Sequence, residues 1–295
     1  MFRSEYARIR MGTRVRIVMY AAEVDLADRA AEAAFARIER VEGALSDWRL
    51  ESEVVGLRAA EPEVWHAVSP DLDRALQVSC AVRESTGGAF DPACGRMSQA
   101  WRRSRELGET PVEWAELIAH AGPPGDRVQA RGGEVRFRLP VPWLDFGGVG
   151  KGLAADAAIV TLRDHGIASA LVDIGGDMAI GAPPPGRSGW RVRGAGSEIE
   201  LVLAWCGVAT SGGGAQHIGP RSHIIDPRTG RWMQRHDDVT VIAPSGAMAD
   251  ALASAGCVLG AAALQESLVG QDGITVLSIS LPKQDTGCQV GSIGQ

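Results

Sequence analysis

The sequence lacks several features that would place it in a specialised class of protein. Its 295 residues carry a formal net charge of -6, so it has no basic excess of the kind that a general nucleic-acid binder needs. Its main basic run, Arg102, Arg103 and Arg105, is interpreted as a solvated helix face. The five cysteines lie far apart without a CxxC pair, which argues against a zinc ribbon or a thioredoxin motif and predicts reduced, mostly buried thiols.

Long apolar segments are also missing. The N-terminus, up to Asp25, holds no continuous apolar core of signal-peptide length. The longest uncharged run, Ala251–Gln265, is too short and too rich in alanine to span a bilayer. As written, the sequence therefore predicts a cytoplasmic protein without a membrane span, and it leaves a periplasmic or membrane-associated role open.

What is present is an irregular mixture of helix and strand signals. Alternation at Val15, Ile17 and Met19 predicts a strand, and apolar residues three and four apart from Leu26 to Leu45 predict an amphipathic helix. Further helices are expected at 69–87, 110–122, 152–165 and 247–259. Further strands are expected on either side of a turn at 131–134 and at 168–174, near 190, 198–203, near 208, 239–243 and 274–279. This irregular order favours an α+β fold, with a single domain over residues 1–280 and a polar tail over 281–295.

The stretch LDFGGVGKGLAADAA, Leu144–Ala158, resembles a loop that grips phosphate. It is not a Walker A loop, because Asp145 stands where the first glycine belongs and Gly152 follows the lysine. It is not a dinucleotide fingerprint either, because Leu153 replaces the last glycine. Small residues before a helix still let backbone N–H groups approach an anion, and Lys151 adds a charge. The alternative is a glycine turn packed against a sheet with this lysine in solvent, and the stretch alone does not decide between them.

Three other stretches carry groups that suit phosphate chemistry. His223 precedes an Asp-Pro-x-Thr-Gly turn that could hold it rigidly. Asp250 and Ser254 lie four residues apart on an expected helix, so a carboxylate and a hydroxyl face one way and would suit Mg²⁺. Each has a plain structural alternative: a packing histidine, a helix-capping aspartate and a small packing serine. A turn at Gly87–Pro92 adds an aromatic ring and the carboxylate of Asp91.

A series of motifs along the chain narrows these choices. In order they are MGT at Met11–Thr13, LSDWRLESEV at Leu45–Val54, GGAFDP at Gly87–Pro92, LDFGGVGKG at Leu144–Gly152, ALVDIGGDM at Ala170–Met178, VATSGG at Val208–Gly213, SHIIDPRTG at Ser222–Gly230 and VTVIAPSGAMADALASAGCVLG at Val239–Gly260. Single motifs are weak, but the series is specific. Together they resemble the ApbE family, the FAD:protein FMN transferases, from about residue 11 to residue 280.

The resemblance implies an FAD-binding α+β fold and a Mg²⁺-dependent cleavage of the FAD pyrophosphate. The FMN half would pass to a Thr or Ser hydroxyl of an acceptor flavoprotein, and AMP would leave. The family's metal site maps onto Asp250, Ser254 and the backbone carbonyl of Gly150. The family's histidine maps onto His223, which would activate the acceptor hydroxyl, while Lys151 would neutralise phosphate charge as a second catalytic residue.

The resemblance also implies a set of cofactor-binding residues, among which Trp48 would stack on the flavin. The full set is Trp48, Asp91, Gly147, Gly148, Gly150, Lys151, Asp177, Thr210 and Ser211. Departures from the family pattern include Asp173 in place of a usual Asn and a shorter loop after Ser211, so the choice of acceptor is left open. Two other functions stay open: an FAD pyrophosphatase in which water replaces the acceptor, and a flavin-binding protein without catalysis.

Overall fold

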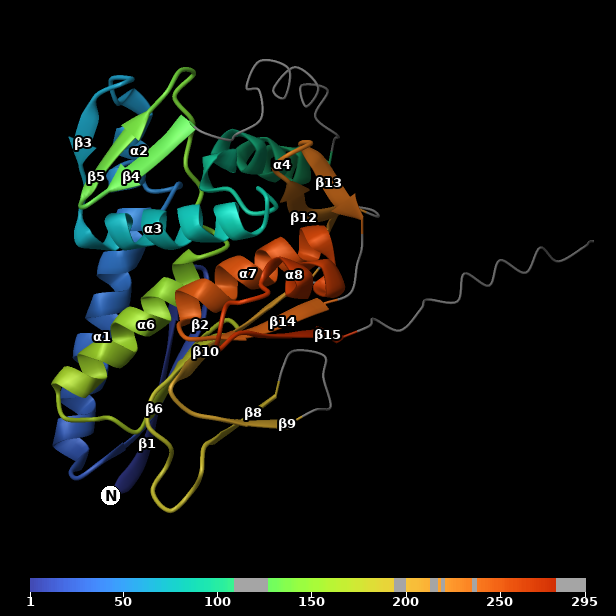
Figure 1. Cartoon of the computed structure of the whole chain (residues 1–295). Helices are drawn as coiled ribbons and strands as arrows, with labels where there is room; N and C mark the ends of the chain where they lie inside the picture. Colours follow the sequence, from blue (N-terminus) through green and yellow to red (C-terminus); the bar gives the residue numbers. More distant parts are fainter. Residues whose placement is uncertain (109–126, 194–199, 213–216, 219–220, 235–237, 280–295) are drawn as a thin grey trace, which may run out of the picture.

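A seven-stranded antiparallel sheet forms the centre of the computed structural model, which describes residues 1–108, 127–193, 200–212, 217–218, 221–234 and 238–279 (Figure 1). Its strand order, β1-β2-β6-β7-β10-β14-β15, places β1 and β15, from the two ends of the described chain, at opposite edges of one sheet. The strands are β1 Phe2–Arg10, β2 Thr13–Ala21, β6 Ala170–Ile174, β7 Asp177–Ile180, β10 Cys206–Ser211, β14 Asp238–Ala243 and β15 Thr275–Ile279.

Helices cover one face of this sheet. Val15, Ile17 and Met19 of β2 are fully buried on that face, which confirms the alternation seen in the sequence. They share a core with α1, α6 and α7, which lie across the strands in Figure 1. The helices are α1 Val24–Leu45, α2 Glu53–Gly56, α3 Pro70–Ser85, α4 Gly95–Leu107, α6 Gly150–Asp164, α7 Gly246–Leu259 and α8 Ala261–Ser267, with short 3₁₀ turns at Leu57–Ala59 and Pro92–Cys94.

The other face of the sheet is covered by a hairpin of β8, Trp190–Arg193, and β9, Glu200–Leu203. Trp190 and Val192 pack there against Val18 of β2 in a second, smaller core. The indole N–H of Trp190 donates to the carbonyl of Ala182 at 2.8 Å, so the buried ring keeps its polar group satisfied. Strands β2, β6, β7 and β10 are therefore covered on both faces, whereas β1 stays partly exposed.

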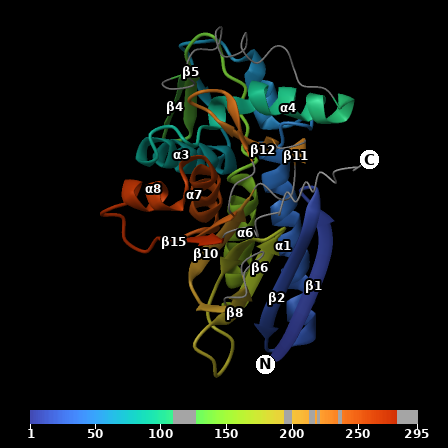
Figure 2. The same ribbon diagram turned by 90° about the vertical axis from the view of Figure 1, so that its right-hand side faces the viewer.

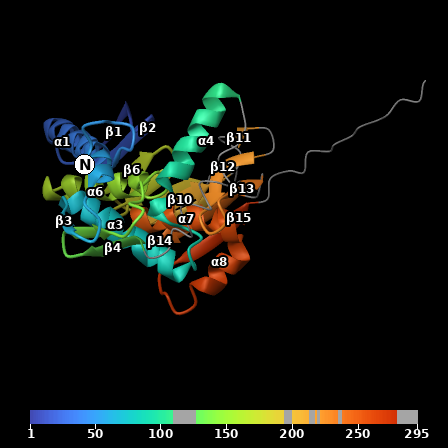
Figure 3. The ribbon, with the colours of Figure 1, turned by 90° about the horizontal axis from the view of Figure 1, so that it is seen from above.

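Two small sheets and the helices α3 and α4 form the part of the molecule above the central sheet (Figure 2). The strands are β3 Trp65–Ala67, β4 Val128–Arg131, β5 Glu134–Phe137, β11 His217–Ile218, β12 Arg221–Asp226 and β13 Arg231–Gln234. Viewed from above, α4 runs beside β12 (Figure 3). This arrangement brings α4 next to the strand that carries His223.

Most expected elements are confirmed, including the α+β class. Ser69 caps α3 by accepting from the N–H of Leu72 with Pro70 in the first turn, and the Gly132-Gly133 turn joins β4 to β5. Helix α6 begins at Gly150, two residues earlier than predicted, which brings Lys151 into its first turn. The expected helix at 110–122, part of the strand at 198–203 and the tail 281–295 lie outside the described residues.

Some expectations were incomplete. No strand was predicted at β1, β3, β7, β11, β12 or β13 and no helix at α2 or α8, while α4 was anticipated only as the helix face of Arg102, Arg103 and Arg105. Among the cysteines that the structure describes, all are free, but Cys257 is buried whereas Cys80, Cys94 and Cys206 are half-buried rather than mostly buried. Within the described ranges, no helix is both long and apolar enough to cross a membrane.

Candidate active site

The glycine-rich loop leads directly into α6 and lies against α7. The N–H of Gly150 donates to the carbonyl of Phe146 at 2.7 Å, which closes the turn before the helix. A Cβ atom on Gly152 would lie 2.1 Å from the carbonyl oxygen of Gly246, so only glycine lets the first turns of α6 and α7 meet. The close approach sets the distance between the lysine of one helix and the acid of the other.

Lys151, Asp177 and Asp250 form a buried group that we call the acid–lysine cluster. The lysine Nζ lies 2.8 Å from Oδ2 of Asp177 and 3.7 Å from Oδ1 of Asp250, and it donates to the carbonyl of Gly147 at 3.3 Å. The other oxygen of Asp250 accepts the backbone N–H of Gly152 at 3.0 Å. The two aspartates are 3% and 1% exposed, so their charges depend on these partners.

The proton affinities of the cluster follow from burial and mutual charge. Burial, together with the charge of Asp250, raises the pKa of Asp177 to about 7, although Lys151 opposes the shift. Burial likewise raises the pKa of Asp250, against the same lysine. Burial alone would lower the pKa of Lys151, but Asp250 and then Asp177 outweigh it and raise that pKa above its ordinary value. The lysine is therefore charged at neutral pH and compensates one of two carboxylates.

Hydroxyl groups lie beside the cluster. Oγ of Ser254, one turn after Asp250 on α7, is 3.3 Å from Oγ of Ser211 at the end of β10. A Cβ on Gly148 would lie 2.8 Å from the Ser254 hydroxyl, so the glycine loop passes directly over it. Thr210, by contrast, bonds the hydroxyl of Thr240 on β14 at 2.9 Å, within the sheet.

These groups fit a hard divalent cation. In the part of the chain that the structure describes, no three His, Cys, Asp or Glu side chains gather as a metal site. Mg²⁺ does not need such a cage, because it commonly takes one or two carboxylates together with waters and substrate phosphates. A buried carboxylate pair that one ammonium compensates only in part, next to the Ser254 hydroxyl and a backbone loop, matches that pattern.

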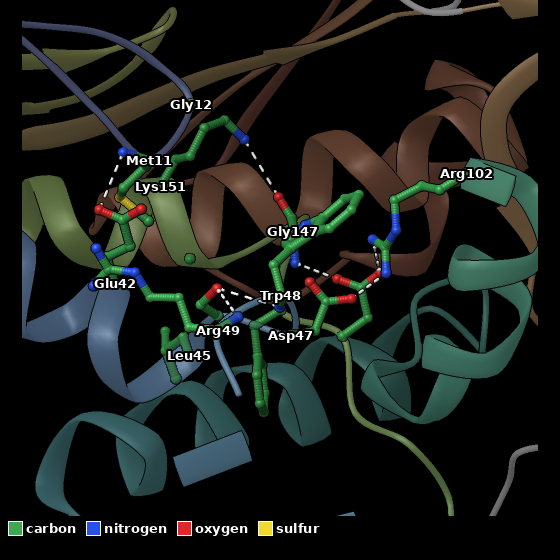
Figure 4. A pocket seen from close by; sticks show the side chains of 14 residues that line it. Met11, Gly12, Glu42, Leu45, Asp47, Trp48, Arg49, Arg102, Gly147 and Lys151 are labelled. Carbon is green, nitrogen blue, oxygen red and sulfur yellow. Dashed lines mark hydrogen bonds and ion pairs between the residues drawn. The ribbon is translucent and has the colours of Figure 1, made fainter. Parts of the chain in front are cut away.

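A cavity of about 380 Å³ opens next to the lysine (Figure 4). Trp48, 62% exposed, and Arg102 form one side of it, and the guanidinium of Arg102 lies 4.4 Å over the centre of the indole ring. The lining is completed by Met11, Gly12, Glu42, Leu45, Ser46, Asp47, Arg49, Asp145, Phe146, Gly147, Gly150 and Lys151.

Arg102 joins this cavity wall to the glycine loop. It bonds the carboxylate of Asp47 and lies 3.7 Å from Oδ2 of Asp145. The latter aspartate accepts the N–H of Gly147 at 2.7 Å. Burial and the charge of Asp145 raise the pKa of Asp47, and Arg102 opposes this shift. The interpretation of Arg102 as part of a solvated helix face was wrong, because its side chain is 19% exposed and pairs with cavity carboxylates; Arg103 and Arg105 are exposed.

Four of the expected site residues, Trp48, Gly147, Gly150 and Lys151, line the cavity, and the other eight do not. His223 and Asp91 are two of these eight. His223, in the middle of β12, packs edge-on against Trp101 of α4 with 6.0 Å between ring centres. The predicted turn follows it, since Asp226 accepts the N–H of Gly230 at 2.7 Å. Asp91 is 5% exposed, pairs with Arg83 and accepts the N–H of Ala93, so its contacts in this structure hold a turn together.

Sequence reasoning missed Asp156 as well as Arg102. The two carboxylate oxygens of Asp156, on α6, accept the first N–H groups of α7, from Gly246 at 2.7 Å and Ala247 at 2.9 Å. Together with the bond from Gly152 to Asp250, each helix thus caps the other. A signal was available, because Asp156 is an acid within the alanine-rich run that follows the glycine loop.

Comparisons with known proteins agree with this architecture. The chain is 32% identical over 291 residues to the FAD:protein FMN transferase of Treponema pallidum, covering 87% of this chain and 79% of that protein. It is 34% identical over 215 residues to the FAD:protein FMN transferase of Rhodobacter capsulatus, covering 65% of this chain but 39% of that longer protein.

Solved structures share the fold. The crystal structure of the ApbE protein from Thermotoga maritima superposes with a TM-score of 0.80 at 28% identity, over 94% of each chain. The flavinyl transferase ApbE of Pseudomonas stutzeri in its apo form superposes with a TM-score of 0.82 over 95% of this chain and 93% of that chain, and at 22% identity this likeness shows the fold alone. The model of the ApbE family matches residues 11–277. Because that match takes in the cavity, the glycine loop and the acid–lysine cluster, this chain belongs to the ApbE family.

Proposed function

We propose that this protein transfers the FMN part of FAD to a Thr or Ser hydroxyl of an acceptor flavoprotein and releases AMP. The observation that carries the proposal is the acid–lysine cluster at the edge of a cavity with an exposed indole, in a chain related to FAD:protein FMN transferases. We also propose one catalytic domain over residues 1–280, which is supported by a single main core that includes β2, α1, α6 and α7.

In this proposal the acceptor oxygen attacks the FMN-side phosphorus. The bond from that phosphorus to the bridging oxygen breaks, and AMP leaves with the bridging oxygen. His223 takes the proton of the acceptor hydroxyl, a step typically worth ~10²–10⁴ in rate. Lys151 offers an ammonium to the negative charge of the pyrophosphate. A Mg²⁺ ion held by Asp250, Ser254 and the carbonyl of Gly150 would supply Lewis-acid polarisation of the phosphate oxygens.

The remaining expected residues bind the dinucleotide. Trp48 stacks on the flavin with the ring face that Arg102 leaves open. Backbone N–H groups at Gly147, Gly148 and Gly150 approach the pyrophosphate, and Lys151 and Asp177 set the charge beneath them. Asp91, Thr210 and Ser211 are proposed to support this site, with Ser211 closest to the metal through its contact with Ser254.

The experiment that tests the transfer step compares His223→Ala with His165→Ala, a control on the exposed end of α6. Purified variants are titrated with FAD and then mixed with FAD, Mg²⁺ and an acceptor that carries a family-type threonine, whose mass is recorded. We expect His223→Ala to bind FAD within a few-fold of wild type but to lose transfer, while His165→Ala keeps both. Transfer by His223→Ala would refute the role of the histidine, and rapid AMP release without acceptor would make the enzyme a pyrophosphatase.

The metal site is tested by Ser254→Thr and Ser254→Val, which are close in size but differ in the hydroxyl. We expect the threonine variant to retain Mg²⁺-dependent AMP release and the valine variant to lose it, as should Asp250→Ala. Circular dichroism checks that all three variants fold. Equal activity of the valine and threonine variants would remove Ser254 from the metal site.

A further inference from the structure

The choice of lysine at position 151 stands out in this sequence. Lys151 and Lys283 are its only lysines, although Lys and Arg together number 30. An arginine would present a rigid planar fork, whereas lysine presents a compact charge on a flexible four-carbon stem. Lysine therefore stands, against the arginine-rich composition of the chain, at a position that contacts two buried carboxylates.

The ammonium of Lys151 occupies the place of a small cation. It has three donors, and the structure surrounds it with Oδ2 of Asp177 at 2.8 Å, the Gly147 carbonyl at 3.3 Å and Oδ1 of Asp250 at 3.7 Å. All of these are oxygen atoms, the donor type that a hard cation takes. The lysine side chain is 30% exposed and also lines the cavity, so the buried position and the cavity are both within reach of one stem.

We propose that Lys151 is a tethered counterion that exchanges with the divalent cation. In the metal-free protein its ammonium compensates Asp177 and Asp250 and holds the glycine loop against them. When a divalent cation binds the carboxylate pair, the lysine leaves for the cavity, where its charge meets the pyrophosphate. This inference rests on the proposed metal site at Asp250, and it adds that Asp177 is a second acid of that site and that lysine and metal compete for both acids.

The charges of the cluster favour exchange of the lysine ammonium for the divalent cation over binding of both at the carboxylate pair. With both carboxylates ionised, as they would be around a bound metal, the two acids and the ammonium sum to one negative charge, and a divalent cation added to all three would leave one net positive charge. Two cations 4 Å or so apart repel strongly where water is excluded. Of the two arginines that line the cavity, Arg102 already pairs with Asp47 and Asp145, and Arg49 is the other. A lysine released by the metal therefore supplies charge to the phosphates.

The test uses the full chain with Mg²⁺ alone and no flavin. Lys151→Met removes the charge and keeps the length of the side chain, and Arg103→Met removes an exposed cation from α4 as the matched control. Without metal, we expect Lys151→Met to melt at a lower temperature than wild type and to regain more of this loss on adding Mg²⁺. By titration calorimetry it should bind Mg²⁺ at least about tenfold more tightly than wild type, because no tethered cation competes. Arg103→Met should match wild type in both measurements.

A second pair of variants tests the competition between lysine and Mg²⁺ if Lys151→Met does not fold. Asp177→Asn leaves one carboxylate for the lysine, and Lys151→Met in that background again removes the competitor. We expect the double variant to bind Mg²⁺ more tightly than Asp177→Asn alone. Equal or weaker Mg²⁺ binding after removal of the lysine, in either background, would overturn the exchange and make Lys151 a permanent ion-pair partner. Neither result depends on FMN transfer, so failure of the proposed function would show in the acceptor assay and not here.

Discussion

The acid–lysine cluster and the rim of the cavity are built in opposite ways. The cluster and the first turns of α6 and α7, which we call the floor of the site, meet the cavity at Gly150 and Lys151. This floor depends on missing side chains, because Gly152 and Gly246 let two helix backbones touch. The rim, formed by Trp48, Asp47 and Arg102, depends on long side chains that reach across from separate elements. A floor set by backbone contact has little freedom to adjust, whereas a rim of long side chains can repack around a ligand.

The largest effect is expected where the floor is tightest. Gly152→Ala places a methyl group 2.1 Å from the carbonyl oxygen of Gly246, so one of the helices must shift. We expect a loss of more than about 3 kcal/mol of stability, at or beyond the usual range for overpacking. Thermal unfolding measures it, and Gly43→Ala on α1, where an added Cβ meets nothing within 4 Å, should be neutral or slightly stabilising. Equal melting temperatures for the two variants would show that the floor can move.

A smaller effect is expected at the rim. Arg102→Ala leaves the carboxylates of Asp47 and Asp145 without their shared partner and frees the ring of Trp48. We expect a loss of about 2 kcal/mol in stability, below the cost of breaking a fully buried pair. The Kd for FAD, followed by flavin fluorescence, should rise about tenfold. The neighbouring exposed Arg103→Ala is the control, and an unchanged Kd for Arg102→Ala would separate the rim from flavin binding.

The smallest effect is expected for Asp156, whose carboxylate caps α7 and whose contribution to stability depends on pH. Burial raises the pKa of Asp156 to about 6 from its ordinary 3.8, against the N–H groups of Ala247 and Gly246. A raised folded-state pKa favours the protonated form, so its contribution to stability is full below pH 3.8 and is lost as the pH rises through about 6. Relative to Asp156→Asn, wild type should therefore gain about 1 kcal/mol between pH 7 and pH 5. Urea unfolding at both pH values measures it, and a difference that stays constant with pH would contradict the shift.

The sequence predicted the local parts of this site better than the distant ones. The spacing of Asp250 and Ser254, the glycine loop and the caps of α3 are local patterns, and the structure has the corresponding elements. The bond between Arg102 and Asp47 joins residues 55 positions apart, and no local pattern reveals it. Strand β1 was missed because its sequence, FRSEYARIR, is largely polar, and its place depends on pairing with β2 and on side-chain bonds to α1.

The order of strands in the central sheet also governs how the protein must be made. Strand β2 pairs with β6, so one edge of β2 stays unpaired during synthesis until residues 170–174 have left the ribosome. The carboxylate of Asp250 arrives later still, on α7. Chains are synthesised from the N-terminus, and pairings between distant segments are slow to form. In a growing chain β1, β2 and α1 are therefore synthesised long before any residue of the acid–lysine cluster. A chain interrupted between them would expose the unpaired edge of β2 and would lack the residues that are proposed to bind the metal.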